Sequence, residues 1–242
     1  MGQSAIRLKY VESDTFSPGG GITGVNNTIV AAKVENLAFA KDVALHYQQQ
    51  NGTWSEVPLT WQKNFNDYDN FILNDDQIYI KRFALRYSVD GVTFWDNNGG
   101  ADYRFDEIHP NTVGGNVVLN LATAHRGTEA GGGFVFTTSW VDGEIYLNNL
   151  SFNKKAGIRL TANDWGSFED TFASFAETVP VAEGISEVEV WKFKSPELNL
   201  DESTPGFKFA IFYTDLDSGE TFWDNNFGRD YTLSKADLST DQ

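Results

Sequence analysis

The sequence predicts an all-β protein built from two antiparallel β-sandwich domains, of the immunoglobulin-like type, in tandem. Three observations lead to this fold class. One block of sequence occurs twice, apolar and polar residues alternate within short segments, and Gly, Asn and Asp cluster between those segments. Alternation with a period of two is typical of a strand with one buried face, and such clusters are typical of turns.

The duplicated block is the clearest feature of the chain. The string TFWDNNGGADY at residues 93–103 recurs as TFWDNNFGRDY at residues 221–231, so that only the seventh and ninth positions differ. A second pair of matching segments lies upstream, at residues 34–41 and 147–154. A repeat of roughly 115 residues is too long for a solenoid unit and fits a complete small domain. The sequence therefore predicts a duplicated domain.

The predicted domains are residues 1–106 and residues 116–242, joined by a linker at residues 107–115. The break is placed there because the stretch is polar and contains a proline and two adjacent glycines. Charge divides unevenly between the two halves. Residues up to 105 have 9 basic and 12 acidic side chains, whereas the rest of the chain has 9 and 22. The acidity is therefore mainly a property of the second half.

The individual strands follow from the alternation. Phe83, Leu85 and Tyr87, for example, are separated by Ala84 and Arg86. The predicted strands, in chain order, are residues 6–10, 43–47 and 83–87 of the first domain and residues 118–121, 158–160 and 207–213 of the second.

Residues 167–175 do not follow this alternation. They begin with a capping box and have the apolar spacing of a helix. The first domain has no counterpart of this pattern around Trp61, so we expect a loop or a short turn here.

Composition excludes several classes of protein. The 242 residues include 18 Lys and Arg against 34 Asp and Glu, a formal charge of −16, which argues against nucleic-acid binding. No apolar run approaches the ~20 residues that span a bilayer, so no membrane association is expected. There is no Cys, and His46, His109 and His125 have no metal-ligand spacing. We therefore expect no disulfide, no metal and no cofactor.

The repeated motif combines residue types that suit a sugar. A pyranose presents an apolar face on which a flat aromatic ring can stack, and hydroxyls that pair well with an amide able to donate and accept. Trp95 lies beside Asn97 and Asn98, and the second copy repeats this with Trp223, Asn225 and Asn226. Phe94 and Trp95 point to opposite faces of a strand, so that only one of them is core. The alternative is a core tryptophan followed by an Asn-rich turn.

An enzymatic alternative rests on carboxylates in the same motif. Asp96 and Asp102, or Asp224 and Asp230 in the second copy, would form the acid and base pair of a small glycoside hydrolase. A sandwich of this size rarely holds a deep cleft, and no nucleophile elbow or phosphate loop is present. We therefore favour binding over catalysis and expect no enzymatic activity.

The Asn-Leu-Ala-Phe-Ala-Lys segment, a downstream Trp and the closing Trp-Asp-Asn-Asn-x-x-x-Asp-Tyr together resemble carbohydrate-binding module family 21. The resemblance covers both domains. It implies β-sandwiches that bind starch or glycogen without catalysis, as found on fungal amylolytic enzymes and in glycogen-targeting subunits of protein phosphatase 1.

The resemblance also implies which residues contact the glucan. Trp54 and Trp95 would be the stacking platforms of the first domain, matched by Trp165 and Trp223 in the second. The expected polar contacts are Asn36, Lys41, Asn97, Asn98 and Asp102, and Asn149, Lys154, Asn225, Asn226 and Asp230 in the second domain. A tyrosine that the family can supply aligns with Ala84 and Ala210, both too small to stack.

Some members of the family have a second sugar site, formed by an aromatic residue of the upstream segment and by rings in the loop that follows. In the first domain the matching residues are Phe39, Phe65 and Tyr68. In the second domain they are Phe152 and Phe175, with Val188 in place of the third ring.

The implied partner is an α-glucan polysaccharide or a maltooligosaccharide, and an amylolytic enzyme in the same polypeptide or complex is a second expected partner. An extracellular location is expected if such an enzyme is the partner; otherwise the compartment is unknown. The alternative role, a glycogen-targeting subunit of protein phosphatase 1, needs an Arg/Lys-Val-x-Phe docking segment, and the sequence has none.

Overall fold

The computed structural model describes residues 4–15, 26–49, 51–65, 67–76, 78, 80, 82–104, 110–131, 134–181, 185–198, 204, 206–234 and 239–240. The chain divides into two compact units. The first comprises Met1–Gly115 with Thr178–Val188, and the second comprises Asn116–Glu177 with Glu189–Gln242. Within the described residues, the only helices are three single turns of 3-10 type, and no helix is long and apolar enough to cross a bilayer.

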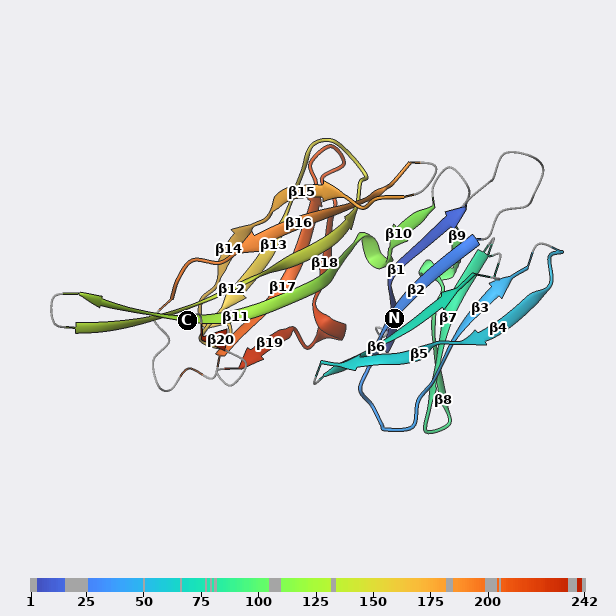
Figure 1. Cartoon of the computed structure of the whole chain (residues 1–242), viewed down its shortest axis with the longest axis horizontal. Helices are drawn as coiled ribbons and strands as arrows, with labels where there is room; N and C mark the ends of the chain where they lie inside the picture. Colours follow the sequence, from blue (N-terminus) through green and yellow to red (C-terminus); the bar gives the residue numbers. More distant parts are fainter. Residues whose placement is uncertain are drawn as a thin grey trace. The chain divides into compact units, whose positions relative to one another are not determined.

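The first unit is a sandwich of two five-stranded sheets (Figure 1). One sheet has the order β10-β1-β2-β6-β5, and the other has β4-β3-β7-β8 with β9 beside β7. The strands are β1 (Ile6–Thr15), β2 (Asn26–Glu35), β3 (Asp42–Gln48), β4 (Trp54–Pro58), β5 (Thr60–Asn64), β6 (Tyr68–Asp75), β7 (Arg82–Val89), β8 (Val92–Asp96), β9 (Tyr103–Arg104) and β10 (Asn111–Val113). β10 lies inside the segment expected to be a linker, where it pairs antiparallel with β1.

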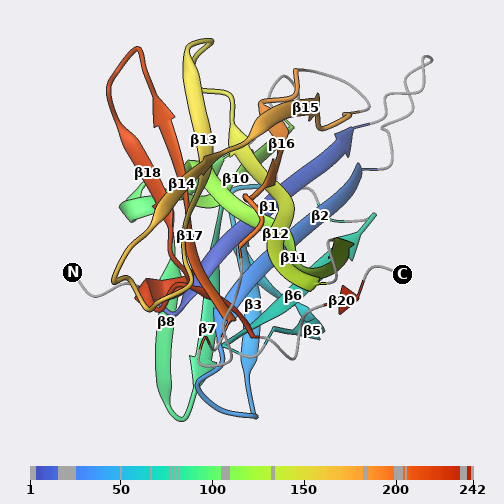
Figure 2. The same cartoon turned by 90° about the vertical axis from the view of Figure 1, so that its left-hand side faces the viewer.

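The second unit has the same plan (Figure 2). Its sheets have the orders β15-β16-β12-β11-β20 and β14-β13-β17-β18, with β19 beside β17. The strands are β11 (Val117–Gly131), β12 (Phe134–Asn148), β13 (Lys154–Thr161), β14 (Glu169–Phe172), β15 (Ser174–Thr178), β16 (Val188–Lys194), β17 (Gly206–Asp215), β18 (Thr221–Asp224), β19 (Tyr231–Ser234) and β20 (Ser239–Thr240). The prediction of an all-β chain with antiparallel sandwich sheets is confirmed.

Alternation places the core as the sequence predicts. On β7 the side chains of Phe83, Leu85 and Tyr87 are fully buried between the two sheets of the first unit. Phe209 and Ile211 do the same on β17 in the second unit. Successive side chains on a strand point to opposite faces, so the residues between them lie on the outer face of the sheet. Those outer faces, on β3–β4–β7–β8 and on β13–β14–β17–β18, present exposed tryptophans that belong to the candidate sites.

The expectation of a loop or short turn at residues 167–175 is wrong. Glu169–Phe172 form β14, which pairs with β13, and Ser174–Thr178 form β15. The capping-box pattern is overridden because β13 offers an open edge, and pairing with it satisfies backbone groups that one isolated helical turn would leave unpaired. Thr171 is buried while its neighbours are exposed, which is strand alternation.

Candidate functional site

Two tryptophans stand on the outer face of the β3–β4–β7–β8 sheet. Trp54 begins β4 and Trp95 lies on β8, and their side chains are 40% and 42% exposed. Phe94, the neighbour of Trp95, turns inward and packs on Tyr87 at a ring distance of 5.8 Å. Of the two adjacent rings, Phe94 is therefore the core residue, which leaves Trp95 on the surface.

An imidazole lies between the two indoles. His46, on β3, stacks on Trp54 with ring centroids 4.8 Å apart and planes 10° from parallel, and meets Trp95 edge-on at 5.5 Å. His46 stands opposite Ala84 in the strand register. Ala84 stands where similar proteins can have a stacking tyrosine, and its small side chain leaves room for the imidazole of His46. Trp54, His46 and Trp95 form one continuous surface, here called the first platform.

Charged side chains border the first platform. His46 Nδ1 lies 3.3 Å from Glu56 Oε1. Arg86 Nε donates to both Glu56 oxygens at 3.1 and 3.3 Å, and its Nη1 donates to Asp42 at 2.8 Å. The hydrogen bond to Asp42, followed by that to Glu56, raises the pKa of Arg86 despite partial burial. Glu56 therefore lies between the Arg86 guanidinium and the His46 imidazole.

The second unit has an equivalent platform with a different centre. Arg159 holds the register place of His46, opposite Ala210, just as His46 is opposite Ala84. Its guanidinium carbon lies 4.3 Å from the ring centre of Phe168 and 5.3 Å from that of Trp223. The Asp170 carboxylate accepts two hydrogen bonds of 2.6 and 2.8 Å from the Arg159 guanidinium, and these hydrogen bonds lower the pKa of the Asp170 carboxyl. Phe168, Arg159 and Trp223 are called the second platform.

An aromatic extension lies beside the second platform. Phe212 packs on Trp223 at 5.7 Å and meets the exposed Phe172 edge-on at 5.9 Å. These rings need Gly157 beneath them, because a Cβ there would lie 3.0 Å from Phe212 and 2.1 Å from the Thr171 carbonyl oxygen. At the equivalent place in the first unit Arg86 stands opposite Trp95.

The structure places Trp165 differently from Trp54, with which it was matched. Glu56 and Asp170 hold equivalent register positions, so the equivalent of Trp54, two residues upstream of Glu56, is Phe168. Trp165 lies in the preceding loop with a left-handed backbone (φ 68°), and its Nε1 donates to Asp230 at 2.9 Å. Trp165 is thus fixed beside Asp230 at the end of the second platform.

The Asn pairs shape the turns that follow β8 and β18. Asn97 and Asn225 accept hydrogen bonds from Gly100 N and Gly228 N at 3.0 and 3.1 Å. Asn226 is 2% exposed and donates to the Asp230 carbonyl, whereas its equivalent Asn98 is exposed. The turn reading of these residues therefore holds, and Asn226 cannot touch a ligand without rearrangement of the turn.

Asp102 in the same turn accepts from Arg82 at 2.7 Å, as Asp230 accepts from Trp165. Asp96 is enclosed: its Oδ2 accepts from Leu8 N at 2.6 Å, and both its oxygens lie 3.0 Å from the Tyr103 hydroxyl. Burial raises the pKa of Asp96 despite these bonds.

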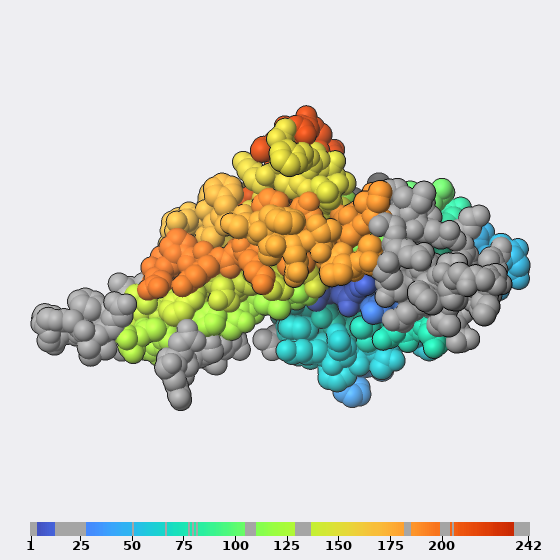
Figure 3. Space-filling model, turned by 45° about the horizontal axis from the view of Figure 1, so that its top comes forward, coloured from blue at the N-terminus to red at the C-terminus, as the bar shows by residue number. Residues whose placement is uncertain are grey.

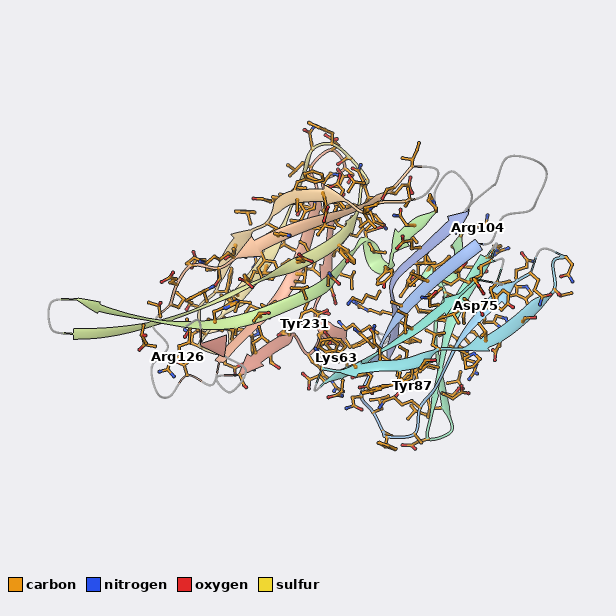
Figure 4. The ribbon with its side chains drawn as sticks, viewed as in Figure 1. Lys63, Asp75, Tyr87, Arg104, Arg126 and Tyr231 are labelled. Atoms are coloured by element: carbon orange, nitrogen blue, oxygen red, sulfur yellow. The ribbon has the colours of Figure 1, made fainter. Side chains whose placement is uncertain are left out.

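Asp224 repeats the arrangement of Asp96. It accepts from Leu119 N at 3.1 Å and from the hydroxyl of Tyr231, which Figure 4 labels on β19. β1 and β11 each have a bulge next to this contact, and a bulge leaves ladder donors that the carboxylate can take up. Asp96 and Asp224 thus join the two sheets of each sandwich, and this role accounts for both carboxylates without catalysis.

A second cluster surrounds a pocket of about 760 Å³ in the first unit. The pocket is lined by side chains from the β2–β3 loop, β5 and β6, namely Asn36, Ala38, Phe39, Lys41, Trp61, Asn64, Asp69 and Phe71. Phe39 is completely exposed and Trp61 is 55% exposed. In Figure 3, β5 and β6 are coloured cyan and lie on the surface of this unit. The structure therefore brings Asn36 and Lys41 together with Phe39, not with the first platform.

Lys41 holds this cluster together from below. Its ammonium lies 2.7 Å from Asp69 and donates to Asn36 at 2.8 Å, and the side chains of Lys41 and Asp69 are nearly fully buried. Burial works to raise the pKa of Asp69, but hydrogen bonds from Lys41, Asn64 and Trp61 outweigh it and lower the pKa.

In the second unit Lys154 pairs with Glu189 at 3.0 Å and donates to Asn149, and Glu189 also accepts from Trp191. Phe175 meets Trp191 edge-on at 6.3 Å, and Phe152 is almost fully exposed.

The other rings expected in the second site lie elsewhere. Phe65 stacks on the buried Tyr68 at 4.9 Å, and neither lines the pocket. Trp61 pairs with Phe71 across β5 and β6, and Phe175 packs on Trp191, so that Trp61 and not Phe65 corresponds to Phe175. Sequence reasoning missed Trp61 as a ring of this site, although it had already compared the segment around Trp61 with residues 167–175, which include Phe175.

The burial of the Lys41–Asp69 pair predicts a stability effect. We expect Lys41→Met to lower the free energy of unfolding by about 3 kcal/mol or more, because it leaves a buried carboxylate without its cation. Urea unfolding measures this. Lys63→Met, which alters an exposed lysine of the same unit, should change stability by at most about 0.5 kcal/mol. The double variant Lys41→Met/Asp69→Leu should recover most of the loss, and a Lys41→Met protein of unchanged stability would contradict the expectation.

Comparison with known proteins adds a family. The sequence model described as "Carbohydrate/starch-binding module (family 21)" matches residues 23–106 and 134–234. Protein phosphatase 1 regulatory subunit 3C of Bos taurus is 30% identical over 93 residues, which are 38% of this chain and 28% of that protein. Glucoamylase 1 of Rhizopus oryzae is 27% identical over 86 residues, 33% of this chain and 14% of that protein. The matched segments thus span less than a third of these relatives' own length.

Among solved structures, the starch binding domain of Rhizopus oryzae glucoamylase in complex with beta-cyclodextrin and maltoheptaose is similar, with a TM-score of 0.31 and 22% identity. That similarity covers 43% of this chain and 93% of the other.

Proposed function

Because the chain belongs to the carbohydrate/starch-binding module family 21, whose sequence model matches a segment in each half of it, we propose that it is a non-catalytic protein that binds α-1,4-glucan at one platform in each unit. The observation that carries the proposal is the pair of platforms themselves. Each presents an exposed tryptophan on the outer face of a sheet, at equivalent register positions. An exposed indole on a rigid sheet costs free energy in water, which a glucose ring stacked on it would recover.

Polar groups around each platform suit glucose hydroxyls. Arg82 and Asp102 border the first platform, and Lys208 and Asp230 hold the equivalent places by the second. The exposed side chains of Asn97 and Asn98 lie in the turn that follows Trp95. Asp230 also fixes the indole of Trp165, so this ring is held in place before a ligand arrives. Pre-organised contacts of this kind lower the entropy lost on binding.

Phe39 and Trp61 line a further contact surface in the first unit, with Asn36 beside them; Phe152 and Phe175 offer a counterpart in the second. Lys41 and Lys154 support these surfaces from buried ion pairs. A chain of glucose units long enough to reach more than one surface would bind more tightly than to any single one, since linked sites share an effective concentration on the order of mM.

The family model is described as carbohydrate- and starch-binding, and one relative, from Drosophila melanogaster, is named glycogen-binding subunit 76A; we extend both ligands to the present chain. We propose starch, glycogen or a maltooligosaccharide as the ligand. An amylolytic enzyme that acts on the same polymer is the second partner that we propose. The two units serve as two binding modules of one protein.

Sedimentation with insoluble starch tests this function. We expect the chain to pellet with starch or with immobilised glycogen, and an excess of soluble maltoheptaose to release it. A β-1,4-linked glucose oligomer of similar length is the matched control, because it has the same hydroxyls in a different shape and should release none. A protein that stays in solution, or that both oligomers release equally, would contradict the proposal. Reducing sugar produced from amylose would contradict its non-catalytic part.

A further inference from the structure

A row of aromatic side chains crosses the outer face of the β14-β13-β17-β18 sheet in the second unit (Figure 2). Phe172, at the end of β14, pairs with Gly157 on β13, which pairs in turn with Phe212 on β17. Phe212 pairs with Trp223 on β18. Residues that lie opposite each other on neighbouring strands point to the same face, so that the three rings form one line. This aromatic row runs from Trp223 of the second platform to Phe172 on the edge strand β14.

The middle ring of the aromatic row is buried, and its end rings are exposed. Phe212 is 5% exposed, whereas Phe172 is 59% exposed. Phe212 leans over Gly157, where a Cβ would lie 3.0 Å from its ring, and it lies 5.9 Å from the Phe172 ring and 5.7 Å from that of Trp223. A glycine inside a strand often marks a close approach of another group. Gly157 thus allows Phe212 to join Phe172 to the second platform.

Polar groups lie on both sides of the aromatic row. Lys155 on β13 is exposed, and its ammonium lies 6.0 Å from the centre of the Phe172 ring. Lys155 pairs with Thr214, which pairs with Thr221, and the two hydroxyls are 3.0 Å apart. Arg159 lies on the other side, two residues beyond Gly157 along β13. A pyranose needs an apolar surface for its C–H face and hydrogen-bonding groups for its hydroxyls, and this arrangement offers both.

The equivalent row of the first unit has a different chemical character. From β4 to β8 it consists of Pro58, Ala44, Arg86 and Trp95. Arg86 makes hydrogen bonds to carboxylates on both neighbouring strands, β3 and β4. A paired guanidinium and a proline therefore replace the two phenylalanines, and this row offers no aromatic ring besides Trp95.

We propose that Phe172 is a further sugar-stacking subsite, which extends the second platform by one ring, so that the second unit binds a longer stretch of glucan than the first unit does. This inference rests on the proposed function and concerns the length of ligand that its sites recognise. Continuity with the second platform favours glucan as the occupant, because a chain that stacks on Trp223 reaches Phe172 by passing over the buried Phe212. Each step between neighbouring rings of the row is comparable with the length of a glucose unit.

The test measures how binding depends on ligand length, in a full-length Trp95→Ala protein whose first platform is silenced. We expect Phe172→Ala in this background to weaken binding of maltoheptaose about five- to tenfold, because a stacking ring is lost. Binding of maltotriose should stay unchanged, since the trisaccharide is covered by the second platform alone. Phe172→Tyr keeps a flat ring and should bind maltoheptaose as the background does. Phe172→Leu keeps apolar bulk without a flat ring and should bind as weakly as Phe172→Ala.

Leu121→Ala is the matched control, because it removes an exposed apolar side chain from β11, in the other sheet of the same unit. It should leave both affinities unchanged, as measured by isothermal titration calorimetry. In a Trp223→Ala background, which reports the first unit, the gain in affinity from maltotriose to maltoheptaose should be smaller than in the Trp95→Ala background.

Two results with Phe172→Ala would overturn the inference and leave the proposed function intact: maltoheptaose affinity equal to that of the background, or the same loss of affinity for both oligosaccharides. Sedimentation velocity without sugar supplies a third, since loss of self-association on Phe172→Ala would make this ring a contact between copies of the chain. If the Trp95→Ala protein itself bound neither oligosaccharide, the glucan site of the second unit would be refuted instead.

Discussion

Replacing both Trp95 and Trp223 with alanine should remove most of the sedimentation of the chain with insoluble starch, leaving at most a weak contribution from the surfaces around Phe39 and Phe152. Each residue is an exposed indole of its platform, and each packs against His46 or Arg159. A tryptophan anchor of this kind typically contributes about 2 kcal/mol or more, close to a thirtyfold change in affinity. Each single variant should keep weak binding but lose avidity, which is worth on the order of 10²-fold for two linked sites.

Trp140→Ala is the matched control for this experiment. Trp140 lies on β12, where His125 stacks on it at 5.3 Å and the Lys194 ammonium lies 4.8 Å from its ring centre. The substitution therefore removes an indole that lies outside both platforms. It should sediment as the wild type does. Equal sedimentation of the Trp95→Ala/Trp223→Ala protein would show that the platforms are not the glucan sites, and would direct attention to the cluster around Phe39.

The fold was predictable from sequence where alternation is strict. The prediction failed where a local sequence signal competes with pairing to a distant strand. Phe83, Leu85 and Tyr87 alternate without interruption, so that one face had to be core. Residues 167–175 were mistaken for a loop because a capping pattern is local, whereas the pairing with β13 that forms β14 is not. Backbone pairing with a distant strand leaves no mark in a short window of sequence.

The site was predictable only where the two copies share residues. Trp95 and Trp223 lie in an unchanged string, and they do occupy equivalent places. Trp54 was matched with Trp165 by residue type, but the loop that precedes β14 differs in length from the one that precedes β4, so Phe168 fills the equivalent place. A repeat search detects identity and not register.

His46 and Arg159 were missed for the same reason. They share a register position, a small neighbour across the sheet and two flanking rings, but not a residue type. The available signal was indirect: Ala84 and Ala210 are small in both copies, at a position where a ring was expected. Small residues facing outward on a sheet leave space, and the side chain opposite occupies it.

Asp224→Ala should cause a large loss of stability, of about 3 kcal/mol or more in the second unit. The carboxylate is buried, and its removal leaves Leu119 N–H and the Tyr231 hydroxyl without their acceptor inside the sandwich. Urea unfolding followed by tryptophan fluorescence should show an earlier transition for the altered unit. Asp217→Ala, which removes an exposed carboxylate of the same unit, is the control and should cost at most about 0.5 kcal/mol. If Asp224→Ala kept full stability, the carboxylate would not be the structural tie that its contacts indicate.

Asp96→Ala should have a similar effect in the first unit, with a characteristic dependence on pH. Burial raises the pKa of Asp96 above its ordinary value of about 3.9, so that folding favours the protonated acid. The stability that this shift contributes is therefore fully present below the unfolded-state pKa and is lost as the pH rises through the folded-state pKa. The difference in free energy of unfolding between wild type and Asp96→Ala should thus grow as the pH is lowered from neutral.

Asp170→Ala should show the reverse trend, because the Arg159 hydrogen bonds lower the pKa of its carboxyl and the stability they contribute disappears on acidification. Parallel urea titrations at neutral and acidic pH would distinguish the two carboxylates, and identical slopes for both variants would contradict their assignment as a buried structural tie and a surface ion pair.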